Sequence, residues 1–295
     1  MNRESSGEIA PINGRGSDAP GNVNRIDACF ARLRTRGAAG LFPFVTCGDP
    51  LPTVAGTVSL LHSLVRHGAD LIELGMPFSD PVADGPVIEK ASERAIAAGV
   101  DLHFVLSCVR EFRVGDPTTP LLLMGYINPL EQYGSARFLA DAGAAGADAV
   151  LLVDCPMEES TPLRPALRAA GLHQILLIAP TTSAARRARL LPEALGFVYY
   201  VSFKGVTGAA RLDTARVADE LRTLRAATTV PLAVGFGIRD GDTAAALAIH
   251  ADAVVIGSAL VESLAGASDS AQVEARVHGF LAPIRRKLDG LKHAA

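Results

Sequence analysis

Short apolar runs of strand length recur along the chain, and stretches with helical periodicity lie between most of them. Each run is apolar at nearly every position, which is typical of strands that are covered on both faces. The eight runs are LFPFVT (41–46), DLIELG (70–75), PLLLMGY (120–126), AVLLVD (149–154), QILLIA (174–179), FVYYVS (197–202), PLAVGF (231–236) and AVVIGS (253–258). Amphipathic helices are expected within 53–67, 86–113, 131–142, 158–169, 211–226 and 241–250.

This alternation of strands and helices predicts a parallel sheet, and eight strands are the number that closes a (β/α)8 barrel. A doubly wound open sheet is the main alternative. It is disfavoured because no strand is followed by a GxGxxG turn, and the nearest match, GFGIRDG (235–241), has the wrong final spacing. We therefore predict an α/β protein with a single TIM-barrel domain over residues 25–295.

Residues 1–24 are rich in Gly, Ser, Asn and Pro and contain no apolar segment, so they are expected to form a flexible, disordered tail and not a signal peptide. Asn24 is a plausible N-cap for a first helix. The apolar face of that helix would consist of Ile26, Phe30 and Leu33. At the other end, residues 283–295 are expected to form a terminal amphipathic helix, with basic residues near its C-terminus.

The composition narrows the classes of function. Apolar residues make up 49% of the chain and the net charge is −3, so neither a nucleic acid nor an anionic membrane is an expected partner. No apolar run approaches the roughly 20 residues that span a bilayer. The four cysteines are scattered without metal-ligand spacing, which favours a reduced, cytoplasmic protein, although disulfide pairing stays open.

The segment LIELGMPFSDPVADGP (71–86) combines apolar residues with acids and with three prolines, which exclude a helix interior or a central strand. Active sites of this barrel lie at the C-terminal ends of the strands. Side-chain alternation places Leu71 and Glu73 on one face, so Glu73 points into the barrel mouth if Leu71 points inward. Asp84 follows in the next loop. The alternative is a structural carboxylate that is paired with an arginine.

Three glycine-bearing turns follow the last three predicted strands, namely KGVTG (204–208), GFG (235–237) and GS (257–258). Glycine lets backbone N–H groups approach an anion closely. Loops after the seventh and eighth strands are the usual phosphate site of this fold. Each turn alone could be a simple chain reversal, but together they predict a phosphorylated substrate.

Five motifs in order, PFVTCGDP (43–50), GADLIELGMPFSDPVADGPVIEKASERAIAAGV (68–100), MGYINP (124–129), YYVSFKGVTGA (199–209) and VGFGIRDG (234–241), closely resemble the tryptophan synthase alpha subunit. The resemblance runs from about residue 25 to about residue 264. It implies a carbon–carbon lyase that splits indole-3-glycerol phosphate, by retro-aldol cleavage, into indole and glyceraldehyde 3-phosphate.

The resemblance also assigns roles to individual residues. It implies that Glu73 is the catalytic acid/base, that Asp84 is the second catalytic acid and that Tyr199 lies near the substrate. Thr207 would belong to a lid that reaches Asp84 on closing. The positions that match substrate or phosphate contacts of the family are Phe44, Tyr126, Gly208, Phe236, Gly237, Gly257 and Ser258.

The two acids have different local surroundings. Glu73 lies among Leu71, Ile72 and Leu74, and this desolvation is expected to raise its pKa toward neutrality, which suits proton transfer. Asp84 lies in a polar loop and is expected to remain ionised more easily, so it could stabilise positive charge at the indole nitrogen.

The resemblance implies an alpha2-beta2 heterotetramer with a beta subunit that carries pyridoxal phosphate and receives the indole. No cofactor and no metal are expected in this chain. The segments 76–80 and 124–129 match surfaces that face the beta subunit. The chain departs from the common family pattern at Cys47, Cys155 and Lys204.

Four other functions are alternatives to that of a lyase subunit. A Schiff-base aldolase would need a desolvated lysine, and of Lys90, Lys204, Lys287 and Lys292 only Lys204 follows a predicted strand closely. A metal-dependent aldolase would need a set of metal ligands, which this sequence lacks. A barrel that only activates a partner would not need both Glu73 and Asp84. A free-standing indole-releasing lyase shares the same chemistry, so sequence separates it poorly from a subunit.

Overall fold

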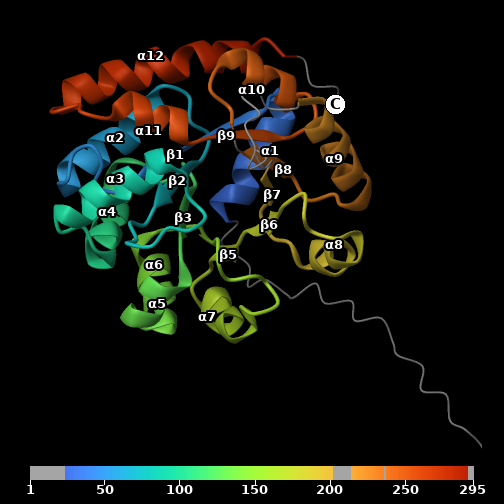
Figure 1. The fold of residues 1–295 in the computed structure, drawn as a ribbon, viewed down its shortest axis with the longest axis horizontal. Coiled ribbons are helices and arrows are strands. Elements are labelled where there is room, and N and C mark those ends of the chain that lie inside the picture. Colours follow the sequence, from blue (N-terminus) through green and yellow to red (C-terminus); the bar gives the residue numbers. More distant parts are fainter. Residues whose placement is uncertain (1–23, 202–213, 236, 292–295) are drawn as a thin grey trace, which may run out of the picture.

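The computed structural model describes residues 24–201, 214–235 and 237–291, which form a parallel barrel surrounded by helices (Figure 1). The predicted tail lies outside these residues, apart from Asn24. The predicted turn at 204–208, with Lys204, Thr207 and Gly208, also lies outside them, and so does Phe236.

The strands are all parallel and follow the order β5-β4-β3-β2-β1-β9-β8-β7-β6. Their bounds are β1 Gly40–Thr46, β2 Ile72–Gly75, β3 Leu121–Gly125, β4 Ala149–Leu152, β5 His173–Gln174, β6 Leu176–Ile178, β7 Val198–Val201, β8 Leu232–Gly235 and β9 Ala253–Ile256. Only Ile175 separates β5 from β6, and its N–H donates to the Val150 carbonyl at 3.0 Å. The two pieces are therefore the predicted fifth strand, with β4 on one side and β7 on the other. The predicted eight-stranded barrel is confirmed, and the open-sheet alternative is wrong.

Helices α2 to α10 lie between successive strands and surround the barrel, whereas α1 precedes β1 and α11 and α12 follow β9 (Figure 1). Their bounds are α1 Arg25–Arg36, α2 Val54–Arg66, α3 Pro86–Ala97, α4 Leu102–Gly115, α5 Ile127–Tyr133, α6 Ser135–Ala145, α7 Arg164–Ala169, α8 Ala184–Leu190, α9 Thr214–Ala227, α10 Gly241–Ala248, α11 Ser258–Leu264 and α12 Ser270–Asp289. Within the described part of the chain, no helix is long and apolar enough to cross a membrane.

Two of the predicted helical segments are interrupted. The segment 86–113 divides into α3 and α4 because Gly99 has a φ of 86° and Asp101 caps α4, accepting a hydrogen bond from the N–H of Phe104 at 2.8 Å. The predicted 131–142 helix is broken at Gly134, where φ is 93°, so its first residues belong to α5 and the others to α6. The last predicted strand, 253–258, ends at Ile256 because Ser258 already begins α11.

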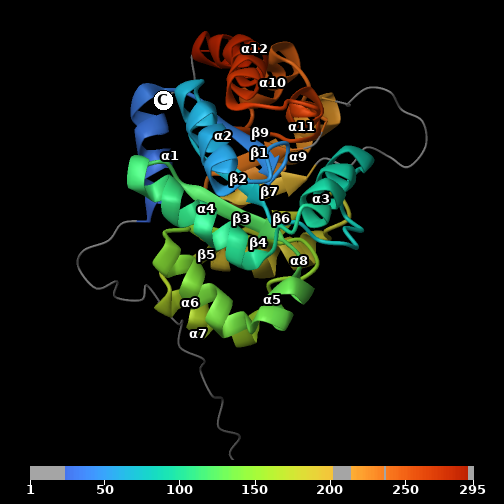
Figure 2. The ribbon, with the colours of Figure 1, turned by 90° about the vertical axis from the view of Figure 1, so that its left-hand side faces the viewer.

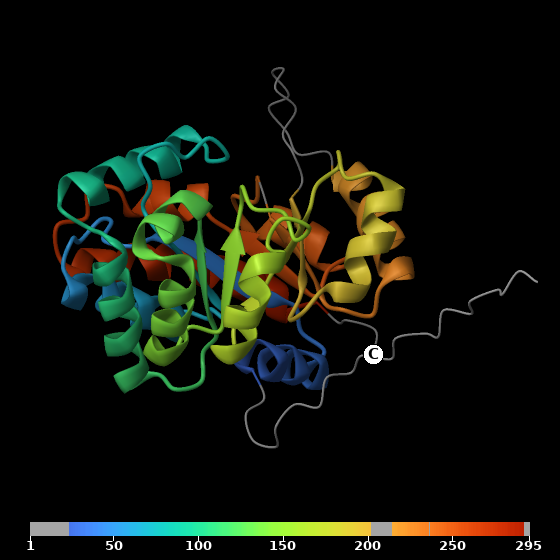
Figure 3. The same cartoon turned by 90° about the horizontal axis from the view of Figure 1, so that it is seen from below.

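Helix α1 closes the N-terminal end of the barrel. The side chain of Asn24 accepts a hydrogen bond from the N–H of Ile26 at 2.9 Å, as predicted for the N-cap. Phe30 packs on Phe42 and Phe197 with ring centroids 5.6 and 5.8 Å apart. Figures 2 and 3 show α1 and α3 at opposite ends of the strands. Helix α1 therefore covers the end of the barrel opposite to α3 (Figures 2 and 3).

Alternation along the strands produces two apolar layers. Leu71 belongs to the cluster inside the barrel, with Phe42, Leu122 and residues of α1. Ile72 and Leu74 belong to the larger cluster between the strands and the outer helices. The predicted inward direction of Leu71 is confirmed, and the same alternation directs Glu73 inward.

Three aspartates fasten the N-terminal ends of neighbouring strands. Each follows an alanine just before a strand and accepts a hydrogen bond from the first or second residue of the preceding strand. The bonds run from the N–H of Leu41 to Asp70, from Leu121 to Asp148 and from Leu232 to Asp252, at 2.9, 2.8 and 2.6 Å. Each aspartate also pairs with an arginine, namely Arg285, Arg113 and Arg225 in turn. The repeated Ala-Asp pair is thus a structural device of this fold.

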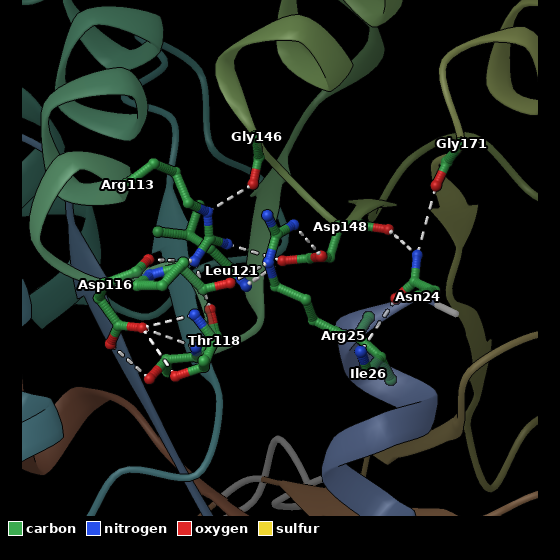
Figure 4. Close-up of polar contacts among 12 residues, drawn as sticks. Asn24, Arg25, Ile26, Arg113, Asp116, Thr118, Leu121, Gly146, Asp148 and Gly171 are labelled. Carbon is green, nitrogen blue, oxygen red and sulfur yellow. Dashed lines mark hydrogen bonds and ion pairs between the residues drawn. The ribbon is translucent and has the colours of Figure 1, made fainter. Parts of the chain in front are cut away.

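The cluster around Asp148 is the most connected of the three (Figure 4). Its carboxylate pairs with Arg25 of α1 at 2.9 Å and with Arg113 of α4 at 2.8 Å. The Asn24 side chain donates to the carbonyl of Asp148 at 2.9 Å. These contacts join α1, α4, β3 and β4 at the closed end of the barrel.

Candidate active site

A cavity of about 310 Å³ lies at the C-terminal ends of the strands. It brings together most of the residues that were expected from the sequence to contact substrate. Those that line it are Phe44, Glu73, Asp84, Tyr199, Gly237, Gly257 and Ser258. Tyr126 instead lines a small chamber beside it, which shares Phe44 and Asp84 with the cavity.

Glu73 lies on β2 and is fully buried, and neither of its carboxylate oxygens has a hydrogen-bond partner among the described residues. Burial raises the pKa of its carboxyl from 4.5 to about 8. No arginine holds it, so the alternative of a structural ion pair is wrong for the described residues. A carboxyl in this state is protonated at neutral pH and has both oxygens free for a ligand.

Asp84 faces the same cavity from the loop between β2 and α3. Tyr126 donates a hydrogen bond to its Oδ2 at 3.1 Å and accepts one from the N–H of Ala83 at 3.0 Å. Burial raises the pKa of Asp84 to about 6, although the Tyr126 hydroxyl lowers it and the charge of Glu89 adds to the rise. The loop is therefore less polar around Asp84 than the sequence indicated. Asp84 is nevertheless mostly ionised at pH 7, where Glu73 is mostly neutral.

Two glycines make room for the aromatic side chains of the cavity. A Cβ at Gly75 would lie 2.6 Å from Cζ of Phe44, and a Cβ at Gly235 would lie 2.5 Å from the Tyr199 hydroxyl. Tyr199 is 7% exposed, and its pKa is raised well above the ordinary value by burial and by the charges of Glu73 and Asp84. Its hydroxyl therefore stays protonated and can donate a hydrogen bond.

The part of the cavity that is lined by the loops after β8 and β9 is suited to an anion. Gly237, with a φ of 77°, and Gly257 both line it. Ser258 begins α11, so the first N–H groups of that helix have no partner within the helix. Arg239 adds a cation to the lining. Two of the three predicted glycine turns therefore meet at one cavity, and the third lies outside the described residues.

Sequence reasoning missed much of the apolar lining. Met124, which was expected to fill either the pocket or the core, lines the cavity. The residues that were not singled out are Ala83, Gly85, Val87, Ile88, Leu151, Val153, Leu177, Val201, Ile238, Arg239, Val255, Ala259 and Glu262. The alternation that places Glu73 inward also applies to Leu151, Leu177 and Val255 on their strands, so a signal for these three was present in the sequence.

The lysines of the described residues lie away from the cavity. Lys90 is exposed on α3, and Lys287 of α12 pairs with Asp242 at 2.8 Å. Neither lines the cavity, and Lys204 lies outside the described residues. Within the described ranges, no group of three His, Cys, Asp or Glu side chains is arranged to hold a metal ion.

A parallel eight-stranded barrel with a cavity at the C-terminal ends of its strands has the architecture of a TIM-barrel enzyme. Comparison with known proteins identifies the family. Residues 30–287 match the sequence model of the tryptophan synthase alpha chain. The chain therefore belongs to the tryptophan synthase alpha chain family.

Individual relatives agree with this assignment. The chain is 55% identical over 270 residues to the tryptophan synthase alpha chain of Xylella fastidiosa (strain 9a5c), covering 92% of this chain and 100% of the relative. It is 55% identical over 267 residues to that of Laribacter hongkongensis, covering 90% and 100%. The crystal structure of tryptophan synthase subunit alpha from Legionella pneumophila str. Paris superposes with a TM-score of 0.83 at 40% identity, covering 92% of this chain and 100% of that one.

Members of this family are lyases of tryptophan biosynthesis that cleave indole-3-glycerol phosphate, and the chain is an enzyme of this kind.

Proposed function

We propose that Glu73 and Asp84 carry out the cleavage, with Glu73 moving protons and Asp84 stabilising the positive charge on the indole nitrogen. The observation that carries this proposal is that both acids face one cavity while burial raises their pKa values unequally, to about 8 and about 6. At pH 7 the pair therefore consists of one proton donor and one anion. That is the combination which the reaction requires.

The chemistry explains this requirement. Breaking the bond between the indole ring and the glyceryl chain would leave a carbanion at C3 of the ring. Protonation of C3 first makes an indolenine, whose nitrogen accepts the electrons of the breaking bond. Glu73 donates that proton and then accepts one from the glyceryl hydroxyl that becomes the aldehyde. Asp84 offsets the charge at the ring nitrogen, and the protonated hydroxyl of Tyr199, in the same cavity, is available to donate a hydrogen bond to the substrate.

The cavity accommodates the two ends of this substrate differently. Phe44 and Met124 are apolar walls for the indole ring, and Tyr126 borders the chamber behind them. Gly237, Gly257 and Ser258 would receive the phosphate through backbone N–H groups and a hydroxyl. The family resemblance adds Gly208 and Phe236 to the phosphate contacts and Thr207 to a closing lid. These three positions lie outside the described residues.

We also propose that the indole passes to a beta subunit in an alpha2-beta2 heterotetramer, with pyridoxal phosphate in the beta subunit and no cofactor in this chain. The loop after β2 supports a docking role, because Val82 is 88% exposed and Phe78 packs on Tyr126 with ring centroids 5.1 Å apart. A cytoplasmic location is consistent with four free thiols, at Cys29, Cys47, Cys108 and Cys155.

The test is an assay of indole and glyceraldehyde 3-phosphate release from indole-3-glycerol phosphate by the purified full-length chain, alone and with a beta subunit. Glu73→Gln should abolish release while substrate binding stays nearly intact. Glu111→Gln, the same change on the exposed face of α4, should leave the rate unaltered. Near-normal turnover by Glu73→Gln would refute the assignment.

Two further measurements separate the alternatives. Size-exclusion chromatography with a beta subunit distinguishes a subunit from a free-standing lyase. Borohydride trapping of a covalent substrate adduct would revive the Schiff-base reaction at a lysine.

A further inference from the structure

The small chamber beside the main cavity holds a polar group that the proposed reaction does not use. The chamber measures about 10 Å³ and is bordered by Thr46, Ser92, Asp84 and Tyr126. Thr46 is 2% exposed, and its hydroxyl has no hydrogen-bond partner among the described residues. A buried hydroxyl without a hydrogen-bond partner reduces the free energy of unfolding. Its presence beside Asp84 therefore indicates that the chamber holds a hydrogen-bonding molecule.

The strand register explains why Thr46 points into this space. Along β1 the side chains of Phe42 and Phe44 face the barrel interior, and Thr46 follows at the next inward position. Its partner on β2 is Gly75, and the Phe44 ring occupies the space in front of that glycine. Thr46 lines the small chamber next to this ring, together with Asp84 and Ser92.

The size and polarity of the chamber suit one water molecule. A buried water requires about 10–15 Å³ and two to four polar partners. The chamber meets the lower limit of volume, and Thr46, Ser92 and Asp84, which all line it, offer two hydroxyls and a carboxylate as partners. The apolar remainder, which includes Phe44 and Met124, excludes more water.

We propose that Thr46 is a positioning residue which, with Ser92, holds one water molecule that donates a hydrogen bond to the carboxylate of Asp84. Together with the Tyr126 hydroxyl, 3.1 Å from Oδ2, this water fixes the direction of the carboxylate and favours its ionised form. The inference rests on the proposed role of Asp84 and adds to it the group that keeps this acid charged inside an apolar cavity.

Other titratable groups also face Asp84. These are Tyr126 at the end of β3, Tyr199 of β7 and Glu89 of α3, while Glu73 of β2 lines the same cavity. Burial raises the pKa values of both tyrosines above the usual value, so their hydroxyls remain neutral between pH 5 and 9. Substitution of Thr46 changes none of these groups. A shift in the acid limb, the fall of kcat at low pH as Asp84 becomes protonated, therefore reports on the water.

The experiment compares the pH dependence of kcat for the wild type, Thr46→Val and Thr46→Ser in the full-length chain with a beta subunit. Valine keeps the shape of threonine without the hydroxyl, and serine keeps the hydroxyl. Loss of one hydrogen bond to a carboxylate should move the acid limb of Thr46→Val upward by about one pH unit. The pKa of about 6 applies to Asp84 without the water, as in Thr46→Val, so Asp84 of the wild type should titrate about one unit lower. The kcat of Thr46→Val should then fall about fivefold at pH 5 but only about 1.3-fold at pH 6.5. Thr46→Ser should retain the wild-type profile.

The possible outcomes separate this inference from the proposed function. An inactive wild type would contradict the proposed function itself. If the wild type is active, the proposed water is contradicted by either of two results for Thr46→Val. One is an unshifted acid limb, and the other is a kcat that is reduced equally at every pH. If Thr46→Val does not fold, a high-resolution crystal structure of the wild type decides. Density for a water within 3.2 Å of both Thr46 Oγ1 and the Asp84 carboxylate is expected, and its absence would overturn the inference.

Discussion

Glu73 should reduce the stability of the folded protein as the pH rises, and Glu73→Gln should remove this effect. The carboxyl is fully buried, and its pKa is about 8 in the folded protein against an ordinary value of 4.5. Between these pH values the folded chain keeps a proton that the unfolded chain releases. The stability associated with the neutral carboxyl is therefore fully present below pH 4.5 and is lost as the pH rises through 8.

The magnitude follows from the size of this pKa change. Each unit is worth about 1.4 kcal/mol, so the free energy of unfolding should lose about 3 kcal/mol between pH 5 and pH 8 on account of Glu73 alone. Glutamine is neutral at both pH values, and its buried amide adds a cost that does not depend on pH. The difference in stability between Glu73→Gln and the wild type should therefore rise by about 3 kcal/mol over this range.

Urea unfolding of both proteins at pH 5 and pH 8 measures this difference. Asp84→Asn should show the same trend at about 1 kcal/mol, because the pKa of Asp84 is raised only to about 6. Ser258→Ala, a change without a titrating group in the same cavity, is the control and should give one constant difference. If the Glu73→Gln difference stays within about 0.5 kcal/mol from pH 5 to pH 8, the carboxyl is solvated and the account of its pKa is wrong.

Three further predictions concern other parts of the molecule. Asp84→Asn should lower kcat by about 10²- to 10⁴-fold, and a change in KM alone would argue against charge stabilisation. Gly75→Ala would place a Cβ 2.6 Å from Phe44, so it should raise KM about tenfold by moving the ring into the cavity; unaltered steady-state kinetics would count against Phe44 as a wall. Asp148→Asn leaves the largely buried Arg113 without its carboxylate and should reduce the free energy of unfolding in urea by about 3 kcal/mol, whereas a loss below about 0.5 kcal/mol would mean that this cluster contributes little.

The sequence predicted the barrel well because its main signals are local. Apolar runs of strand length and the capping side chain of Asn24 depend on neighbouring residues, and both occur where they were expected. The break between α3 and α4 was missed, although Gly99 and Asp101 mark it, because the amphipathic pattern continues across the gap. The short helix α11 was missed because its first residue was assigned to the strand before it.

The site was predictable only in part, because cavities depend on contacts that are distant in the sequence. Glu73 could be placed from alternation on a single strand. That it lacks a hydrogen-bond partner among the described residues could not be predicted, since this depends on every element around the barrel mouth. The raised pKa of Asp84 depends in the same way on how the loop packs. The Ala-Asp pairs at Asp70, Asp148 and Asp252 were visible as a repeat in the sequence, but their arginine partners come from distant segments.

The two ends of the barrel treat carboxylates in opposite ways, and this contrast explains how one fold supports the reaction. At the closed end, Asp148 has two arginines and a backbone N–H, so its charge is compensated and it holds strands together. At the C-terminal end of the strands, Glu73 has no hydrogen-bond partner among the described residues, and its burial opposes folding at neutral pH. A partner for Glu73 would stabilise the protein but would lower its pKa and occupy the oxygens that must exchange protons with substrate. The ion pairs at the closed end thus help to stabilise the barrel. A barrel stabilised in this way can bury Glu73 without a counter-charge at its other end.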